Sequence, residues 1–410
     1  MGRRRNFAWL PLALTLLGIA AASALYIFGM AWYQSIDANF FDASDLWVPR
    51  SIDVLISLWL LWLGASIGSF LNVVAWRMPR GVSINGRSHC PRCETHLKFR
   101  DNLPVLGWIS LRGRCRTCRL PISPRYPIVE FAVGVSLTLI GFTELYQLAI
   151  PGQPDPWTSR PLWTPRIHQP LLIVLVYHAT ALAMSWVFGL IRYDRSILPW
   201  RLVSFAALAM IVPILAFPTL MIVPWQTVRP EDWVPDGLYF DAVMRVVTAL
   251  AASAVIARSL ARGLCPSADP KLDPLGSGTA RLMDLVVIVS VPGVVVGWQA
   301  LPAIITMASL LALVLRAVLK GTDTLGCFAL AVPVTLTLQI SFWRHLHSAS
   351  FWPSDQTSHW VILAWAVAIL VIPVWLREAP QPVMPVKPVF VDDEDEDEAA
   401  APSEPTDACE

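Results

Sequence analysis

Four cysteines in one arginine-rich loop are the residues of this sequence whose types and spacing most directly predict chemistry. They form two C-x-x-C pairs, which are separated by residues 94–114. The pairs are Cys90 with Cys93, and Cys115 with Cys118. Thiolate sulfurs in two such pairs suit tetrahedral Zn²⁺, because each pair supplies two ligands from one tight turn. Disulfides are the alternative, but a bridge within one C-x-x-C turn is strained. The spacing therefore favours a structural zinc site.

The composition around this loop is that of a membrane protein. The chain has 410 residues, of which 55% are hydrophobic and 15% are charged, and its mean hydropathy is +0.54. About a quarter of the residues would be charged in a soluble domain. Long apolar segments recur along the chain, and each can cross a bilayer as a helix. The expected spans are about 9–31, 53–76, 127–150, 170–191, 202–223, 241–260, 282–299, 301–319, 324–343 and 359–376. A very short turn is expected near Ala300, between two of these spans.

The sequence thus predicts an all-α polytopic membrane protein of about ten transmembrane helices, with a small cytoplasmic loop domain that binds zinc through its four cysteines. Most of the 31 Lys and Arg residues lie on one membrane side if the N-terminus is inside, so both termini are expected in the cytoplasm. Arg3 to Arg5 and the apolar run after them resemble a signal peptide. The run is longer than a signal core, so a retained anchor helix is expected and cleavage is the alternative.

Five parts are predicted along the chain. They are an N-terminal anchor helix with an outer loop (1–52), a second transmembrane helix (53–76), the cytoplasmic cysteine loop (77–126), a multi-helix membrane bundle (127–378) and a disordered acidic tail (379–410). The tail is expected to be disordered because its run of acidic residues cannot bury a core. Three further cysteines, Cys265, Cys327 and Cys409, are expected to be unpaired thiols.

Motifs on both sides of the cysteines have a recognisable order. Residues 68–79 read G-S-F-L-N-V-V-A-W-R-M-P, and residues 100–108 between the two pairs read R-D-N-L-P-V-L-G-W. Residues 121–127 read P-I-S-P-R-Y-P and are followed by Val129 and Glu130. In this order and spacing, the region resembles the bacterial type IV prepilin peptidase family. The resemblance follows residues 54–343, strongly up to residue 130 and loosely after it.

The resemblance implies a membrane enzyme with two activities. One activity cleaves the leader from the prepilins and pseudopilins of type IV pilus and type II secretion systems. The other methylates the new N-terminus with S-adenosylmethionine. The resemblance also implies a multi-pass protein of the bacterial cytoplasmic (inner) membrane. Its expected partners are prepilin or pseudopilin precursors and the lipid bilayer, and no nucleic acid.

The resemblance further implies that leader cleavage needs two aspartates, and both family positions differ in this chain. One aspartate stands seven residues before a proline, and Arg192 occupies that place before Pro199. The other aspartate ends a G-x-G-D motif, whose counterpart here ends in Thr279. Neither a guanidinium nor a hydroxyl can replace a carboxylate in acid–base catalysis. The catalytic dyad is therefore expected to be degenerate.

Asp194 and Asp284 are the two carboxylates that could replace the missing pair. On ideal helices they lie roughly 200° and 140° around from the family positions, so a change of register would be needed. Otherwise Asp194 is expected to pair with Arg192, Arg195 or Arg201 at the membrane surface. Three interpretations follow. The chain lacks leader cleavage but keeps methyl transfer or precursor binding; it is an active aspartic endopeptidase that uses Asp194 and Asp284; or it is a non-enzymatic scaffold for pilus or secretion assembly.

Overall fold

The computed structural model describes most of the chain. The described residues are 10–37, 41–90, 92–151, 164–223, 225, 237–268, 271, 273–319, 322–354 and 356–377. The predicted acidic tail, Arg3 to Arg5 and Cys409 lie outside these residues, so the expectations for them stay predictions.

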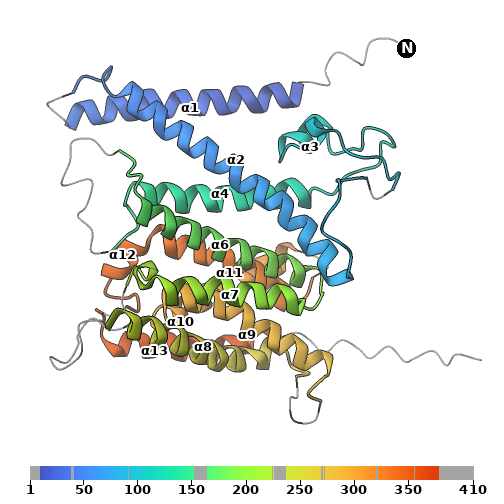
Figure 1. Ribbon diagram of the computed structural model, residues 1–410, viewed down its shortest axis with the longest axis vertical. Coiled ribbons are helices and arrows are strands. Elements are labelled where there is room, and N and C mark those ends of the chain that lie inside the picture. The colour runs from blue at the N-terminus through green and yellow to red at the C-terminus, as the bar shows by residue number, and fades with distance from the viewer. Residues whose placement is uncertain are drawn as a thin grey trace, which may run out of the picture. The chain divides into compact units, whose positions relative to one another are not determined.

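The described residues form an all-α protein. Within them, nine helices are long and apolar enough to cross a membrane (Figure 1). These helices are α1 (Leu10–Asp37), α2 (Trp47–Arg77), α4 (Arg125–Leu145), α6 (Gln169–Tyr193), α8 (Gly237–Leu264), α9 (Ser277–Val296), α10 (Leu301–Val318), α11 (Thr324–Ser341) and α13 (His359–Leu376). A further apolar helix, α7 (Trp200–Ala216), is shorter. The remaining short helices are α3 (Leu106–Ser110), α12 (Trp343–Ser348), and the 3₁₀ turns η1 (Met78–Arg80), η2 (Phe99–Asp101) and η3 (Pro218–Leu220).

The predicted membrane architecture is confirmed, because the ten expected spans correspond to the nine long helices and α7. The short turn near Ala300 is also confirmed, since α9 ends at Val296 and α10 begins at Leu301. Gly297 in this turn has a φ of +93°, which a glycine adopts without strain. The span predicted at 202–223 was too long. Helix α7 ends at Ala216, because Pro218 lacks the backbone N–H group that would bond to the Ile214 carbonyl and continue the helix.

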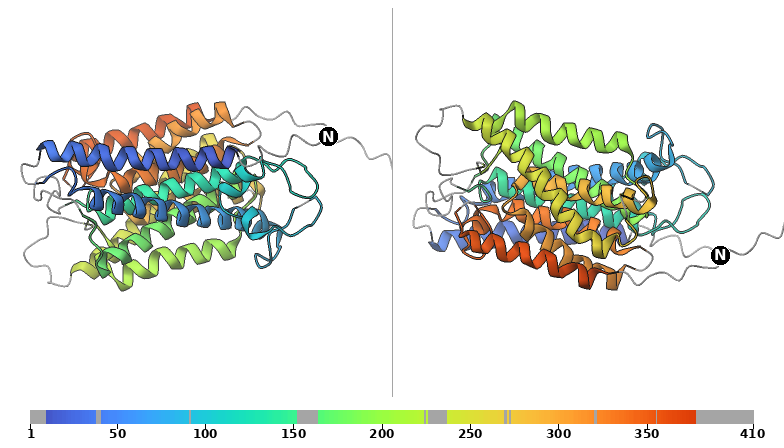
Figure 2. Two further views of the ribbon diagram at one scale, coloured as in Figure 1. Left: turned by 90° about the horizontal axis from the view of Figure 1, so that it is seen from above. Right: turned by 90° about the horizontal axis from the view of Figure 1, so that it is seen from below.

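The cysteine loop lies at one end of the bundle, which we call the loop end (Figure 2). Because successive spans alternate in direction, the C-terminal ends of α2, α6, α8, α10 and α13 all lie at this end (Figure 1). The N-terminal ends of α4, α7, α9 and α11 lie there too. The candidate chemistry is concentrated at the loop end, because the cysteines, Arg192, Thr279 and Asp284 all belong to these helix ends or to the loop.

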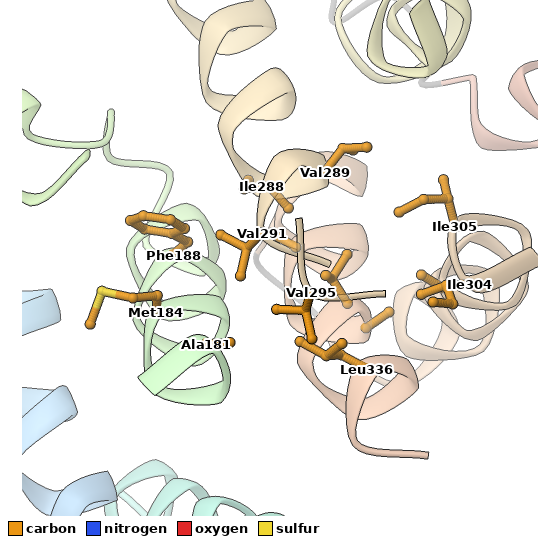
Figure 3. Close-up of a cluster of buried hydrophobic side chains, with 14 of the residues drawn as sticks. Ala181, Met184, Phe188, Ile288, Val289, Val291, Val295, Ile304, Ile305 and Leu336 are labelled. Carbon is orange, nitrogen blue, oxygen red and sulfur yellow. The ribbon is translucent and has the colours of Figure 1, made fainter. Parts of the chain in front are cut away.

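The core that holds the bundle together lies among α6, α9, α10 and α11 (Figure 3). Phe188 of α6, Val295 of α9, Ile305 of α10 and Leu336 of α11 are at most 3% exposed. Between spans, such close packing supplies the association energy that the hydrophobic effect supplies in water. The core therefore fixes the relative positions of the helices that carry the charged residues of the loop end.

Small residues let α2 approach α4 closely. A Cβ atom added at Gly64 would lie 2.9 Å from the Cα atom of Gly134. One added at Gly68, the first residue of the G-S-F motif, would lie 2.9 Å from the Cα atom of Glu130. Glycines spaced four apart on one helix allow such backbone contact between spans. The family-like glycine of this motif is therefore a packing residue.

Replacing Gly68 by leucine is expected to force α2 away from α4 and to lower the stability of the protein by about 1–3 kcal/mol, the usual range for overpacking. Thermal unfolding of the purified protein in detergent measures this change. Gly18→Leu on α1 is the matched control, because no atom lies within 4 Å of a Cβ added at Gly18. Equal midpoints for the two variants would show that the contact between α2 and α4 is not tight.

A buried polar cluster attaches α1 to the bundle at the end opposite the cysteine loop. The Asp53 carboxylate of α2 accepts hydrogen bonds from the hydroxyls of Tyr26 on α1 and Tyr146, which follows α4. Arg50 pairs with the same carboxylate at 2.7 Å. Arg50 and Asp53 both lie within α2, and their pairing allows charged residues at the start of this helix. Helix α2 therefore begins at Trp47, before the apolar run that starts at residue 53.

Candidate functional site

The two cysteine pairs form a pair of equivalent knuckles. In the first knuckle, the Cys90 amide donates to the Thr95 carbonyl at 3.1 Å, and the Glu94 amide donates to the Cys90 carbonyl at 2.9 Å. Glu94 has a φ of +53°, which turns the chain back beneath the sulfurs. The second knuckle repeats these three features at its own residues, Cys115, Arg119 and Leu120. The repeated backbone conformation directs four sulfurs toward one point.

The sulfur positions fit a tetrahedral metal ion. All four Sγ atoms lie within 4.8 Å of one another. The Cys90–Cys118 and Cys93–Cys115 sulfur pairs are each 3.9 Å apart. Zinc–sulfur bonds of about 2.3 Å in a tetrahedron place sulfurs roughly 3.8 Å apart. All four cysteines are free thiols, so the disulfide alternative is not adopted. The cluster can hold a metal ion, and its four sulfur donors favour Zn²⁺.

The protonation of the thiols shows what a metal ion would add. The Thr95 hydroxyl and backbone lower the pKa of Cys93 to about 6, and backbone amides also lower the pKa of Cys115. The pKa of Cys118 is raised to about 11, because burial and the neighbouring sulfurs outweigh the hydrogen bond from the Leu120 amide. A bound Zn²⁺ would hold all four groups as thiolates, including Cys118, whose pKa is raised while no metal is bound.

The family-like residues between the knuckles hold the loop together. The Arg116 guanidinium donates to the Asp101 carboxylate and lowers the pKa of that carboxyl. The Trp108 indole donates to the Ile122 carbonyl at 3.1 Å, and its ring covers Gly113, whose φ is +66°. These contacts assign structural roles to residues of the R-D-N-L-P-V-L-G-W motif.

Glu130 ties the cysteine loop to the membrane bundle. Its carboxylate is buried on α4 and accepts a hydrogen bond from the Val105 amide at 2.7 Å. Val105 has a φ of +61°, an unfavourable conformation for a β-branched residue that persists only where its surroundings hold it. The contact fixes the loop against the helix that Gly68 also touches.

Arg192, which stands where the resemblance led us to expect the first aspartate, is buried in a charge cluster. Its side chain is 2% exposed at the end of α6. The guanidinium pairs with Asp284 of α9 at 3.2 Å and with Asp323 at 3.4 Å, and it donates to the Ser196 carbonyl at 2.8 Å. A buried arginine is tolerated only when its charge and donors are paired in this way. Arg192 is therefore a buried cation that two carboxylates neutralise.

Asp323 and Arg281 complete this charge cluster. Asp323 caps α11, since its carboxylate accepts from the Gly326 amide at 2.7 Å. The same carboxylate pairs with Arg281 of α9 at 3.0 Å. We refer to Arg192, Asp284, Asp323 and Arg281 as the four-charge cluster. It joins α6, α9 and α11 at the loop end.

Thr279, which stands where the resemblance led us to expect the second aspartate, has a structural contact. Its side chain is buried near the start of α9, and its hydroxyl donates to the Asp273 carbonyl at 2.7 Å. Gly278 beside it packs on the chain at Ser267, where a Cβ atom would lie 2.4 Å from the carbonyl oxygen. Thr279 thus stabilises the turn into α9.

Asp194 is held by a different arginine from those predicted. Its carboxylate accepts two hydrogen bonds from Arg125, one of them at 3.0 Å, and the Arg125 guanidinium also lies 4.9 Å from the Tyr193 ring. The predicted pairing with Arg192, Arg195 or Arg201 was wrong, because Arg125 approaches from the start of α4. Sequence separation hides this contact between the exit of the cysteine loop and the end of α6.

The two candidate replacement carboxylates have separate partners. Asp194 is paired with Arg125, whereas Asp284 accepts from Arg192 and from the Leu198 amide at 3.2 Å. Among the described residues, no hydrogen bond or ion pair joins these two carboxylates and no donor is shared by them. Their use as a catalytic pair would require both arginine contacts to change.

A buried pair at the other end of the bundle was not predicted. Glu144 of α4 and His178 of α6 form a hydrogen bond between the carboxyl group and the Nδ1 atom of the ring, and both side chains are at most 1% exposed. The His178 ring lies 6.1 Å from the Trp343 ring. The sequence shows only that Glu144 and His178 each lie within an apolar span. The spacing of residues along either helix does not show that these two side chains meet. Intramembrane ionisable pairs of this kind are costly unless both groups are satisfied.

Comparison with known proteins places the cysteine loop in a family context. Residues 62–143 match the model described as Bacterial Peptidase A24 N-terminal domain. This range contains the second half of α2, both knuckles and most of α4. No solved structure matches the chain.

Three similar relatives carry related names. A prepilin leader peptidase/N-methyltransferase of Myxococcus xanthus is 47% identical over 89 residues, which are 22% of this chain and 27% of the relative. A type 4 prepilin-like proteins leader peptide-processing enzyme of Escherichia coli is 29% identical over 210 residues, or 39% of this chain and 78% of the relative. A prepilin leader peptidase/N-methyltransferase of Klebsiella pneumoniae is 42% identical over 98 residues, or 22% of this chain and 41% of the relative. The chain thus spans less than half the length of the first and third of these relatives.

Proposed function

We propose that this chain, whose residues 62–143 are a bacterial peptidase A24 N-terminal domain, is a prepilin peptidase family membrane protein that has lost leader cleavage. It keeps the cysteine loop, and with it the binding of prepilin or pseudopilin precursors and the transfer of a methyl group to a processed N-terminus. The observation that carries the proposal is the burial of Arg192 between Asp284 and Asp323 at a family aspartate position.

The chemistry of an aspartic peptidase supports this proposal. Such an enzyme needs two carboxylates that share one proton around a water molecule. Arg192 stays protonated at any working pH and contributes no carboxylate. Both oxygens of Asp284 already accept hydrogen bonds, from Arg192 and from the Leu198 amide. Activation of a water molecule by Asp284 would therefore break contacts that stabilise a buried charge.

The intact front part of the chain supports the retained activities. The cysteine loop is fixed at the loop end of the bundle, where Arg192 also lies. It is held by the knuckles, the Asp101–Arg116 pair and the Glu130–Val105 contact. S-adenosylmethionine would supply the methyl group when it is bound. The proposed membrane is the bacterial cytoplasmic membrane. In it, the loop end and both termini lie on the cytoplasmic side. The arginines of the loop support this orientation.

A methylation assay tests the retained activity. The purified full-length chain is mixed with a pilin whose leader has already been removed and with labelled S-adenosylmethionine. We expect label in the pilin and co-purification of the pilin with the chain. Cys115→Ser should abolish the labelling, whereas Asp194→Asn should leave it nearly unchanged. Absence of both labelling and co-purification would overturn the proposal.

The scaffold alternative predicts a different pattern in the same experiment. Co-purification of the pilin without label would make the chain a non-enzymatic assembly factor that docks precursor helices. The endopeptidase alternative predicts leader release from an unprocessed prepilin through Asp194 and Asp284.

A further inference from the structure

A basic pocket lies between α8 and α13 at the loop end. Its volume is about 380 Å³, within the usual range of small-molecule sites. Three arginines line it, Arg258 and Arg262 from the end of α8 and Arg377 directly after α13. Cys265 forms part of its inner wall. We call this the α8–α13 pocket.

Close packing of the two helices brings the three arginines together. A Cβ atom added at Gly263 would lie 2.5 Å from the carbonyl oxygen of Pro373, so α8 and α13 touch backbone to backbone at this point. Arg258 and Arg262 are four residues apart and therefore share one face of α8. Figure 1 shows the two helices side by side. The pocket is thus a fixed feature of the helix packing.

The described residues that line the pocket carry an excess of positive charge. Within the described part of the chain, none of the three guanidiniums forms an ion pair and no carboxylate lines the pocket. Arg316 lies beside it and donates to the Arg377 carbonyl at 3.5 Å. Burial raises the pKa of Cys265 to about 11, so its thiol adds no negative charge. Three arginines that line one pocket favour an anionic ligand.

The surroundings of the pocket are apolar and exposed. Val255 of α8 is 68% exposed, and Val374 and Trp375 of α13 are 72% and 58% exposed. Tryptophan at the end of a span is typical of the interface between acyl chains and headgroups. A ligand in the pocket can therefore place an anionic group among the arginines while its acyl chains lie along α8 and α13.

We propose that the α8–α13 pocket binds the phosphate headgroup of an anionic phospholipid from the surrounding leaflet. Basic pockets between helices at a membrane surface are suited to such headgroups, and guanidiniums bind phosphate oxygens in pairs. The exposed apolar faces of α8 and α13 favour a lipid over a free phosphate. Only a lipid can contact both the arginines of the pocket and these apolar faces. This proposal is independent of the activity of the cysteine loop.

Native mass spectrometry of the full-length chain in detergent tests the proposal. The protein is titrated with phosphatidylglycerol, with phosphatidylcholine, and with glycerol phosphate as a soluble headgroup. We expect retained phosphatidylglycerol at low ratios and much weaker retention of the other two. Each change to glutamine at Arg258, Arg262 or Arg377 should weaken phosphatidylglycerol binding about fivefold, and the triple variant on the order of a hundredfold.

Arg201→Gln is the matched control, because Arg201 is an exposed arginine at the same membrane end and lies over the Trp200 ring rather than in the pocket. It should bind phosphatidylglycerol as the wild type does. Equal binding by the triple variant and the control would overturn the proposal. Binding of glycerol phosphate as tight as that of the lipid would also overturn it in favour of a soluble phosphate ligand. The arginines are exposed, so the variants should fold, and thermal unfolding checks this directly.

Discussion

Replacing Cys115 by serine is expected to remove the metal from the knuckles and to unfold the cysteine loop while the membrane bundle stays folded. The zinc content should fall from about one ion per chain to nearly none. Structural zinc binding contributes on the order of 10 kcal/mol to the folding of such modules, far more than the few hydrogen bonds of this loop. Among the described residues of 85–124 no helix is longer than α3, so apart from the contacts of Asp101, Trp108 and Val105 we expect the metal to hold this loop.

Metal analysis and limited proteolysis measure this effect. Cleavage within the loop should become at least roughly tenfold faster in Cys115→Ser or after treatment with a strong chelator. Cys265→Ser is the control, because Cys265 is a buried free thiol outside the knuckles. An unchanged zinc content in Cys115→Ser, or a loop that stays protected without metal, would contradict a structural zinc site formed by the four cysteines.

Replacing Arg192 by methionine is expected to destabilise the bundle by about 3–5 kcal/mol. Removal of one partner leaves buried charge uncompensated, and this costs far more than an exposed ion pair contributes. Asp284 would lose its only ion-pair partner among the described residues, and Asp323 would keep Arg281. Unfolding in mixed detergent micelles measures the change.

The neighbouring Arg195 provides a matched control for this prediction. Arg195 is exposed, so Arg195→Met should change the stability by less than about 0.5 kcal/mol. Adding Asp284→Asn to Arg192→Met should recover part of the loss, because the unpaired charge is removed. If Arg192→Met were no more harmful than Arg195→Met, the four-charge cluster would not be the stabilising contact described here.

The spans could be predicted from sequence because a long apolar segment that crosses a bilayer must form a helix to satisfy its backbone hydrogen bonds. The same property hid the start of α2, since Arg50 lies before the apolar run and is nevertheless inside the helix, where it pairs with Asp53. The cysteine site could also be predicted, because both ligands of each knuckle are close in sequence and adopt one local backbone conformation.

The partners of the charged residues could not be predicted in the same way. Asp194 and Arg125 are separated by two spans, α4 and α6, and the connection between them. Asp323 reaches Arg192 only because α6 and α11 pack together. The sequence drew attention to Arg192, but it did not identify the acids that neutralise this arginine. Asp323 carried one local signal, since an aspartate before an apolar run is typical of a helix N-cap.

Leader release from an unprocessed prepilin by the purified wild-type chain tests the central proposal most directly. A relative named prepilin leader peptidase/N-methyltransferase, such as that of Klebsiella pneumoniae, provides the positive control. We expect no released leader under conditions in which the control converts the substrate completely. Release by the wild-type chain that disappears in Asp194→Asn or in Asp284→Asn would contradict the loss of peptidase activity and would assign the cleavage to those carboxylates.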